Sequence, residues 1–115
     1  MSDAYTFPHQ RLDAYRVALD LAVACHAICQ ALPRGNANLA DQLRRASQAI
    51  PLLVGEGANR RTHAQKRQRY TEAAGEAGEV ACALELIHRL DLADVSSAWP
   101  LAQRVHAMTT RLSRR

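Results

Sequence analysis

Residues 42–61 read QLRRASQAIPLLVGEGANRR, and this stretch says more about the fold than any other part of the chain. Its apolar residues recur at steps of three and four, the spacing that places side chains on one face of an α-helix. The stripe consists of Leu43, Ala46, Ile50, Leu53 and Gly57. The sequence Gly55-Glu56-Gly57 then predicts that this helix loosens and ends, shortly before Arg60 and Arg61.

The composition is that of one helical domain. The chain has 115 residues, of which 48% are hydrophobic and only 4% aromatic, which is enough apolar mass for one core. Alanine and leucine supply most of that mass and favour close packing of helix on helix. We therefore expect a single all-α domain over residues 1–115.

Four amphipathic segments separated by short polar breaks indicate four helices. Their expected ranges are about 8–32, 38–58, 63–91 and 97–113. Thr62 followed by Gln65 fits a capping box at the start of the third helix, and Ser96 or Ser97 is expected to cap the fourth. Helices of this kind joined by short loops are typical of an antiparallel, up-down-up-down four-helix bundle.

Two prolines and two glycines are expected to affect the predicted helices locally. Pro51 has no amide hydrogen and crowds the preceding turn, so the second helix is expected to kink there. Pro100 fits a helix only within its first turn. Gly75 and Gly78 each cost about 1 kcal/mol relative to alanine in a helix, which suggests that a neighbouring helix approaches closely.

The first predicted helix is apolar on two faces. One stripe contains Leu12, Tyr15, Leu19, Ala22 and Cys29. The other contains Val17, Leu21, Ala24 and Ile28. If one face enters the bundle core, the other requires separate cover, which predicts an oligomer with the second stripe at the subunit interface. The alternative is one wide apolar face on a central helix.

Charge is unevenly distributed along the chain. Residues 32–69 contain eight basic and two acidic residues, whereas residues 70–95 contain one basic and six acidic residues. The basic part includes a strip suited to phosphate contact, namely Arg60, Arg61, Lys66, Arg67 and Arg69. Because Tyr70 is the only aromatic residue nearby, binding should be directed at a nucleic-acid backbone. The alternative is a solvated helix start whose arginines pair with Glu72 and Glu76.

Two acids are interpreted as structural. Glu56 and Glu79 lie beside small residues near the core stripes, where a carboxylate needs a basic partner, and Arg45 is the natural one. This internal salt bridge is favoured over general acid catalysis. A narrow, alanine-rich bundle also leaves little room for a cleft, so we expect no catalytic residues, no cofactor and no small-molecule substrate.

Cysteine and histidine raise the possibility of a metal site. Cys25 and Cys29 lie one turn apart, with His26 between them and with Cys82 and His88 elsewhere in the chain. No second paired motif completes a four-ligand set, so we expect no metal and instead three reduced, buried cysteines. The absence of a signal peptide pattern and of about 20 consecutive apolar residues predicts a cytoplasmic protein outside membranes.

Several motifs together resemble a known protein family. They are Phe7, Leu12, Tyr15 and Ala18 in the first helix, Leu39, Gln42, Arg45, Ala46, Ile50, Val54, Glu56, Gly57 and Arg60 around the second, and Gly75 and Glu79 in the third. The pattern is similar to that of four-helix bundle proteins encoded in intervening sequences of large-subunit ribosomal RNA genes, a family related to the accessory variability proteins of diversity-generating retroelements. The resemblance covers residues 7–112. Ala49, Leu53 and Gly55 depart from it, since the family commonly has serine, asparagine and alanine there.

The resemblance implies a cytoplasmic four-helix bundle that assembles as a ring of five subunits, with a basic surface and no catalytic activity. Its retroelement members bind a reverse transcriptase and nucleic acid. The expected partners are therefore further copies of the chain, with RNA, DNA or a reverse transcriptase as candidates. The alternative function is a structural ring or protein–protein adaptor in which the basic strip serves only solubility and assembly.

Overall fold

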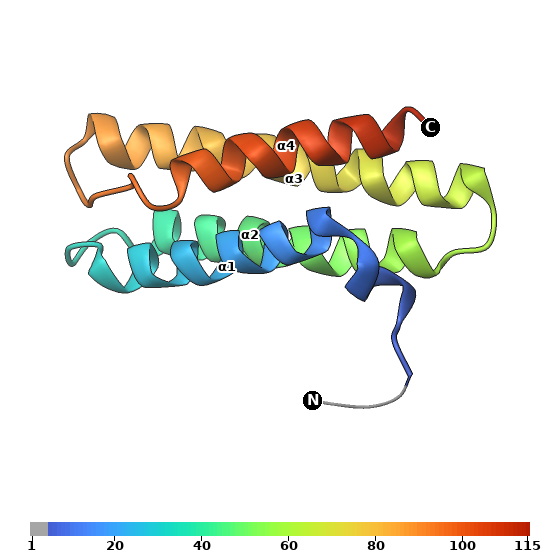
Figure 1. The fold of residues 1–115 in the computed structure, drawn as a ribbon. Coiled ribbons are helices and arrows are strands. Elements are labelled where there is room, and N and C mark those ends of the chain that lie inside the picture. The colour runs from blue at the N-terminus through green and yellow to red at the C-terminus, as the bar shows by residue number, and fades with distance from the viewer. Residues whose placement is uncertain (1–4) are drawn as a thin grey trace.

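The computed structural model describes residues 5–115, which form an all-α bundle. Within these residues the chain contains one 3-10 turn and four α-helices, and no strand. Their bounds are η1 Pro8–Arg11, α1 Asp13–Ala31, α2 Ala37–Asn59, α3 His63–Arg89 and α4 Trp99–Ser113. The helices lie side by side along the long axis of a body measuring 44 × 32 × 21 Å (Figure 1). The prediction of an all-α fold is confirmed.

Contacts between the helix ends show which segments meet. The thiol of Cys29, near the end of α1, donates to the carbonyl oxygen of Ala40 near the start of α2 at 3.3 Å. The side-chain nitrogen Nδ2 of Asn59, at the end of α2, lies 3.0 Å from Nδ1 of His9 in η1. One end of the bundle therefore gathers η1, the α2–α3 turn and the end of α4, as Figure 1 also shows.

The core is built from aliphatic side chains on the inner faces of all four helices. The largest fully buried aliphatic residues are Leu21, Leu43, Ile50, Val54, Val80, Leu84, Ile87 and Val105. Burying one such side chain stabilises the fold by roughly 1.5–3 kcal/mol. Buried alanines such as Ala18, Ala46 and Ala77 fill the places between them and let the helix backbones come close.

The first helix begins later than its sequence pattern predicts. Residues 8–11 form η1, and Leu12 then has an extended backbone with φ −90° and ψ 124°, so that α1 begins only at Asp13. Pro8 suits the start of η1, and the side chain of Gln10 accepts a hydrogen bond from the amide of Phe7 at 2.7 Å. The negative charge of Asp13 in the first turn of α1 favours a new helix start there.

The prediction that the second apolar stripe of α1 forms a subunit interface is wrong, because this stripe lies in the core of the single chain. Val17, Leu21 and Ile28 are buried, and Ala24 is half-buried. Periodicity identified both apolar faces of the helix, but only contact with the other helices decides which face is covered. Of the large apolar side chains on α1, Leu19 and Val23 are the ones left exposed.

The second helix ends within one residue of its predicted end, although its two glycines do not interrupt it. α2 runs through both Gly55 and Gly57 to Asn59, and it continues on both sides of the buried Pro51. Gly57 is buried because the ring of Tyr70 in α3 covers it. An added Cβ at position 57 would lie 2.6 Å from Cε1 of Tyr70. Close packing, and not the end of the helix, accounts for this glycine.

The remaining turns agree only partly with the sequence predictions. The side chain of Thr62 accepts a hydrogen bond from the amide of Gln65 at 3.1 Å, which confirms the predicted cap of α3. The predicted serine cap of α4 is wrong, since Ala98 occupies the cap position. The amide of Ser96 instead bonds to Asp94. Pro100 lies in the first turn of α4, as predicted.

The cysteines do not all share one environment. Cys25 and Cys29 are buried, whereas Cys82 is exposed, so the prediction of three buried cysteines is wrong for Cys82. Burial, together with the neighbouring Cys29, raises the pKa of the Cys25 thiol to about 12. All three thiols are free. Among residues 5–115, no helix combines the length and apolar content needed to cross a membrane.

The glycines of α2 and α3 provide a test of this packing. Gly57→Ala should destabilise the fold by about 1–3 kcal/mol, because the new methyl group overlaps the buried ring of Tyr70. The expected close approach of a helix at Gly75 and Gly78 is wrong, because nothing lies within 4 Å of a Cβ added at either position. Gly75→Ala should therefore stabilise the fold by about 0.5–1 kcal/mol, since alanine is the better helix former. Urea denaturation followed by circular dichroism measures both values. Equal effects of the two substitutions would contradict the packing described.

Candidate nucleic-acid interface

The turn between α2 and α3 exposes two adjacent arginines. Arg60 follows the last residue of α2 with an extended backbone, and Thr62 caps the start of α3, so Arg60 and Arg61 occupy the turn between the two helices. Both residues are exposed, as is Arg67 one turn into α3. This turn lies at the end of the bundle that also contains η1 and the end of α4.

Residues from distant parts of the chain add to this basic surface. Arg11, Arg111 and Arg115 line one hollow of about 240 Å³. A neighbouring hollow of about 190 Å³ is lined by His63, Arg67 and, again, Arg115. We call the combined surface the basic end. Its members are Arg11, Arg60, Arg61, His63, Arg67, Arg111, Arg114 and Arg115.

The arginines of the basic end are available for an external anion. The ion pairs formed among residues 5–115 involve Arg16, Arg44, Arg45 and Arg69, and no arginine of the basic end. Arg67 does make a long contact, 3.5 Å, to the carbonyl oxygen of Arg115. Guanidinium groups without a carboxylate partner are the natural ligands of phosphate oxygens.

Two members of the predicted basic strip have internal roles instead. Nζ of Lys66 donates to the carbonyl oxygens of Ala58 at 3.0 Å and Gly57 at 3.3 Å, and so satisfies acceptors left open at the end of α2. Arg69 pairs with Glu72 at 2.5 Å and with Glu56 at 3.6 Å. The strip of five therefore contributes Arg60, Arg61 and Arg67 to the exposed surface.

Tyr70 offers no stacking surface to a base. Its side chain is buried against Gly57, and burial raises the pKa of its hydroxyl, an effect that the nearby Arg115 partly offsets. The chemistry of the basic end is therefore dominated by guanidinium groups, which favour contact with a phosphate backbone over recognition of bases.

The predicted structural acids form ion pairs at the surface. Arg45 pairs with Glu79 and lies 3.8 Å from Glu76, but the side chain of Arg45 is 58% exposed and that of Glu79 is 36% exposed. The prediction that this pair is shielded from water is therefore wrong. Glu56 pairs with Arg69 and not with Arg45. Exposed pairs of this kind contribute roughly 0.2–1 kcal/mol each.

Residues considered for a metal site do not come together. Cys25 and Cys29 lie in the bundle interior, while His26 and His88 are exposed. Over residues 5–115, no three histidine, cysteine or acidic side chains form a group that could hold a metal ion.

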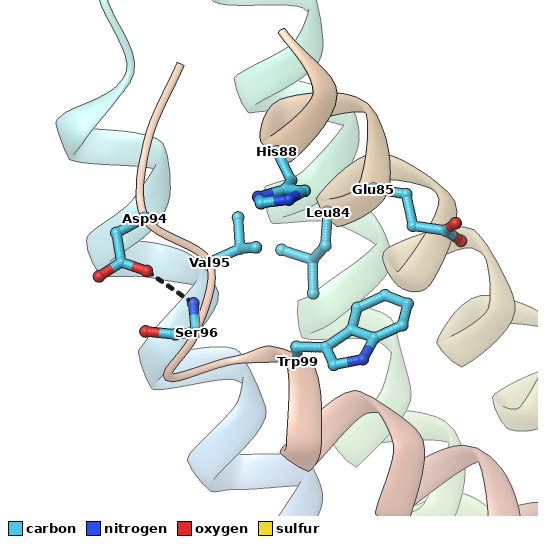
Figure 2. A pocket seen from close by; sticks show the side chains of 7 residues that line it. All are labelled: Leu84, Glu85, His88, Asp94, Val95, Ser96 and Trp99. Carbon is cyan, nitrogen blue, oxygen red and sulfur yellow. Dashed lines mark hydrogen bonds between the residues drawn. The ribbon is translucent and has the colours of Figure 1, made fainter. Parts of the chain in front are cut away.

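A cavity exists at the other end of the bundle, contrary to the expectation that the helices leave no room for one. It measures about 410 Å³ and lies where the segment between α3 and α4 packs against both helices. Leu84, Val95 and Trp99 surround its centre, and His88 lies at its edge (Figure 2). The carboxylate of Asp94 accepts a hydrogen bond from the amide of Ser96 at 2.9 Å, which lowers the pKa of Asp94.

The comparison with protein families gives one match that covers almost the whole chain. A family model described as 23S rRNA-intervening sequence protein matches residues 10–114. This range contains all four helices and every arginine of the basic end except Arg115. No protein with a curated description matches the chain.

The acidic cluster beside Arg45 predicts a pH dependence of stability. Desolvation and the nearby Glu79 raise the pKa of Glu76 in the folded state, so its proton favours folding at low pH and this contribution is lost as the pH rises above 4.5. Glu76→Gln should therefore stabilise the fold at pH 7, and the difference from the unchanged protein should vanish near pH 4. Urea denaturation at a series of pH values measures this difference. A variant that is less stable at pH 7 would show that the contact with Arg45 outweighs the carboxylate repulsion.

Proposed function

Because this chain belongs to the 23S rRNA-intervening sequence protein family, we propose that it is a non-enzymatic, oligomeric binding protein of the cytoplasm whose basic end contacts the phosphate backbone of RNA or DNA. The observation that carries the proposal is the set of arginines at one end of the bundle that form no ion pair with any other residue of 5–115. Three separate segments supply them, so the surface is wider than the α2–α3 turn alone.

The proposed protein is an antiparallel four-helix bundle that assembles into a ring, with five subunits as the expected number. Apolar side chains exposed on α1 and α2 support assembly. Val23 is 72% exposed, Leu52 is 68% exposed and Leu19 is 41% exposed. Large aliphatic side chains held in water favour an interface that covers them. Each added subunit would repeat the basic end and strengthen its attraction for a polyanion.

Binding to nucleic acid is tested by gel retardation of single-stranded and structured RNA and DNA. We expect retardation with little sequence preference and a steep loss of affinity with added salt, because bound arginines release condensed counterions. The slope of log affinity against log salt is negative, and each phosphate contact on a single strand contributes about −0.7 to it. Replacing Arg60, Arg61 and Arg67 by glutamine should therefore make this slope less negative by about 2.

A matched control separates position from net charge. Arg34, Arg89 and Arg104 are also exposed but lie outside the basic end, and their replacement by glutamine removes the same charge. This control should leave the salt slope nearly unchanged. Equal loss of binding in the two triple variants would refute a localised site. Failure of the unchanged protein to bind any nucleic acid at roughly 50 mM salt, where screening is weak, would favour the adaptor function instead.

Assembly is tested by light scattering of the whole chain at micromolar concentration. We expect a mass of five times the 12.7 kDa of one chain. Leu19→Asp together with Leu52→Asp should reduce the mass while the helical circular dichroism stays unchanged, because both side chains are exposed in the single chain. A monomeric unchanged protein would contradict assembly, and an unchanged mass for the variant would exclude this face as the interface.

A further inference from the structure

The cavity between α3, α4 and their connecting segment has the dimensions of a small-molecule site. Its volume of about 410 Å³ lies within the range of roughly 300–1,000 Å³ that is common for such sites. Leu84 and Val95 are buried at its centre, and the half-buried indole of Trp99 forms one side (Figure 2). The cavity lies at the end of the bundle opposite the basic end, so it is separate from the proposed nucleic-acid surface.

The charged groups around this cavity are acidic. Glu85 and Asp94 line it, and no lysine or arginine does. Neither carboxylate forms an ion pair with any side chain of residues 5–115. In Figure 2 the two carboxylates lie on opposite sides of the apolar centre, and that of Asp94 is turned away from Trp99. Their charges therefore act on the mouth of the cavity from two sides and do not form a chelating pair.

The remaining polar lining is compatible with a positive ligand. His88 is exposed at the rim of the cavity. The indole ring is the aromatic group that attracts cations most strongly through its face. Two carboxylates that form no ion pair within residues 5–115 thus flank a cavity walled by aliphatic side chains and an indole ring, and this arrangement disfavours an anion.

We propose that this cavity binds a small organic cation, whose apolar part lies against Leu84, Val95 and Trp99 and whose positive charge faces the indole ring and Glu85. The apolar walls favour a ligand with a hydrocarbon or aromatic body, since a fully hydrated inorganic cation would gain nothing from them. This binding is independent of the nucleic-acid function, and either can be absent without the other.

Trp99 makes the proposal measurable, because it is the only tryptophan in the chain. The full chain is titrated with phenethyltrimethylammonium, whose charge is permanent, while the emission of Trp99 is recorded. The matched ligand is 3-phenylpropionate, which has a similar apolar body and the opposite charge. We expect a saturable change with the cation and an affinity at least about tenfold lower for the anion, a difference of about 1.4 kcal/mol.

Substitution of one carboxylate tests the role of charge. Glu85→Gln should lower the affinity for the cation at least threefold and leave the helical circular dichroism unchanged, since Glu85 is exposed. Asp20→Asn is the matched control, because Asp20 is also exposed on a helix and forms no ion pair within residues 5–115. The proposal is overturned by any of three results: no saturable change below about 10 mM cation, equal affinity for the anion, or equal effects of the two substitutions.

Discussion

The close contact between the backbone of Gly57 and the ring of Tyr70 sets the geometry of one whole end of this bundle. With no side chain at position 57, α2 and α3 converge just before the turn that joins them. Lys66 can then reach back to the carbonyl oxygens at the end of α2. The turn is therefore held from both sides, and the short segment that contains Arg60 and Arg61 is presented at the surface.

The same kind of side chain has two different roles at this end. Lys66 and Arg69 lie within reach of helix carbonyl oxygens or carboxylates, and their charges are satisfied inside the protein. Arg60, Arg61 and Arg67 lack carboxylate partners among residues 5–115. One or two residues along α3 are enough to change the role, because a helix turns a side chain through about 100° at each step. The number of basic residues in a sequence thus overestimates the number that can meet a ligand.

Periodicity was sufficient to predict the all-α class and most of the buried stripe of α2. It failed on α1, where two apolar faces compete and only the packing of the other helices buries Val17 and Leu21 while leaving Val23 exposed. Periodicity also could not predict that Arg11 and Arg111 lie near the α2–α3 turn, because their positions depend on how the ends of the helices pack together. The cavity beside Trp99 was missed because it depends on the path of the segment between α3 and α4.

The basic end also has a consequence for the rate of encounter. The molecule is 44 Å long, with the basic end at one end and, at the other, the carboxylates Glu85 and Asp94 that flank the cavity. In the field of a polyanion such a body experiences a torque as well as an attraction, so it turns its arginines forward before contact. Orientation during diffusion raises association rates by roughly 10- to 1,000-fold. Salt screens this field over about 10 Å at 0.1 M. The torque therefore orients the protein only when the two surfaces are within about that distance of each other.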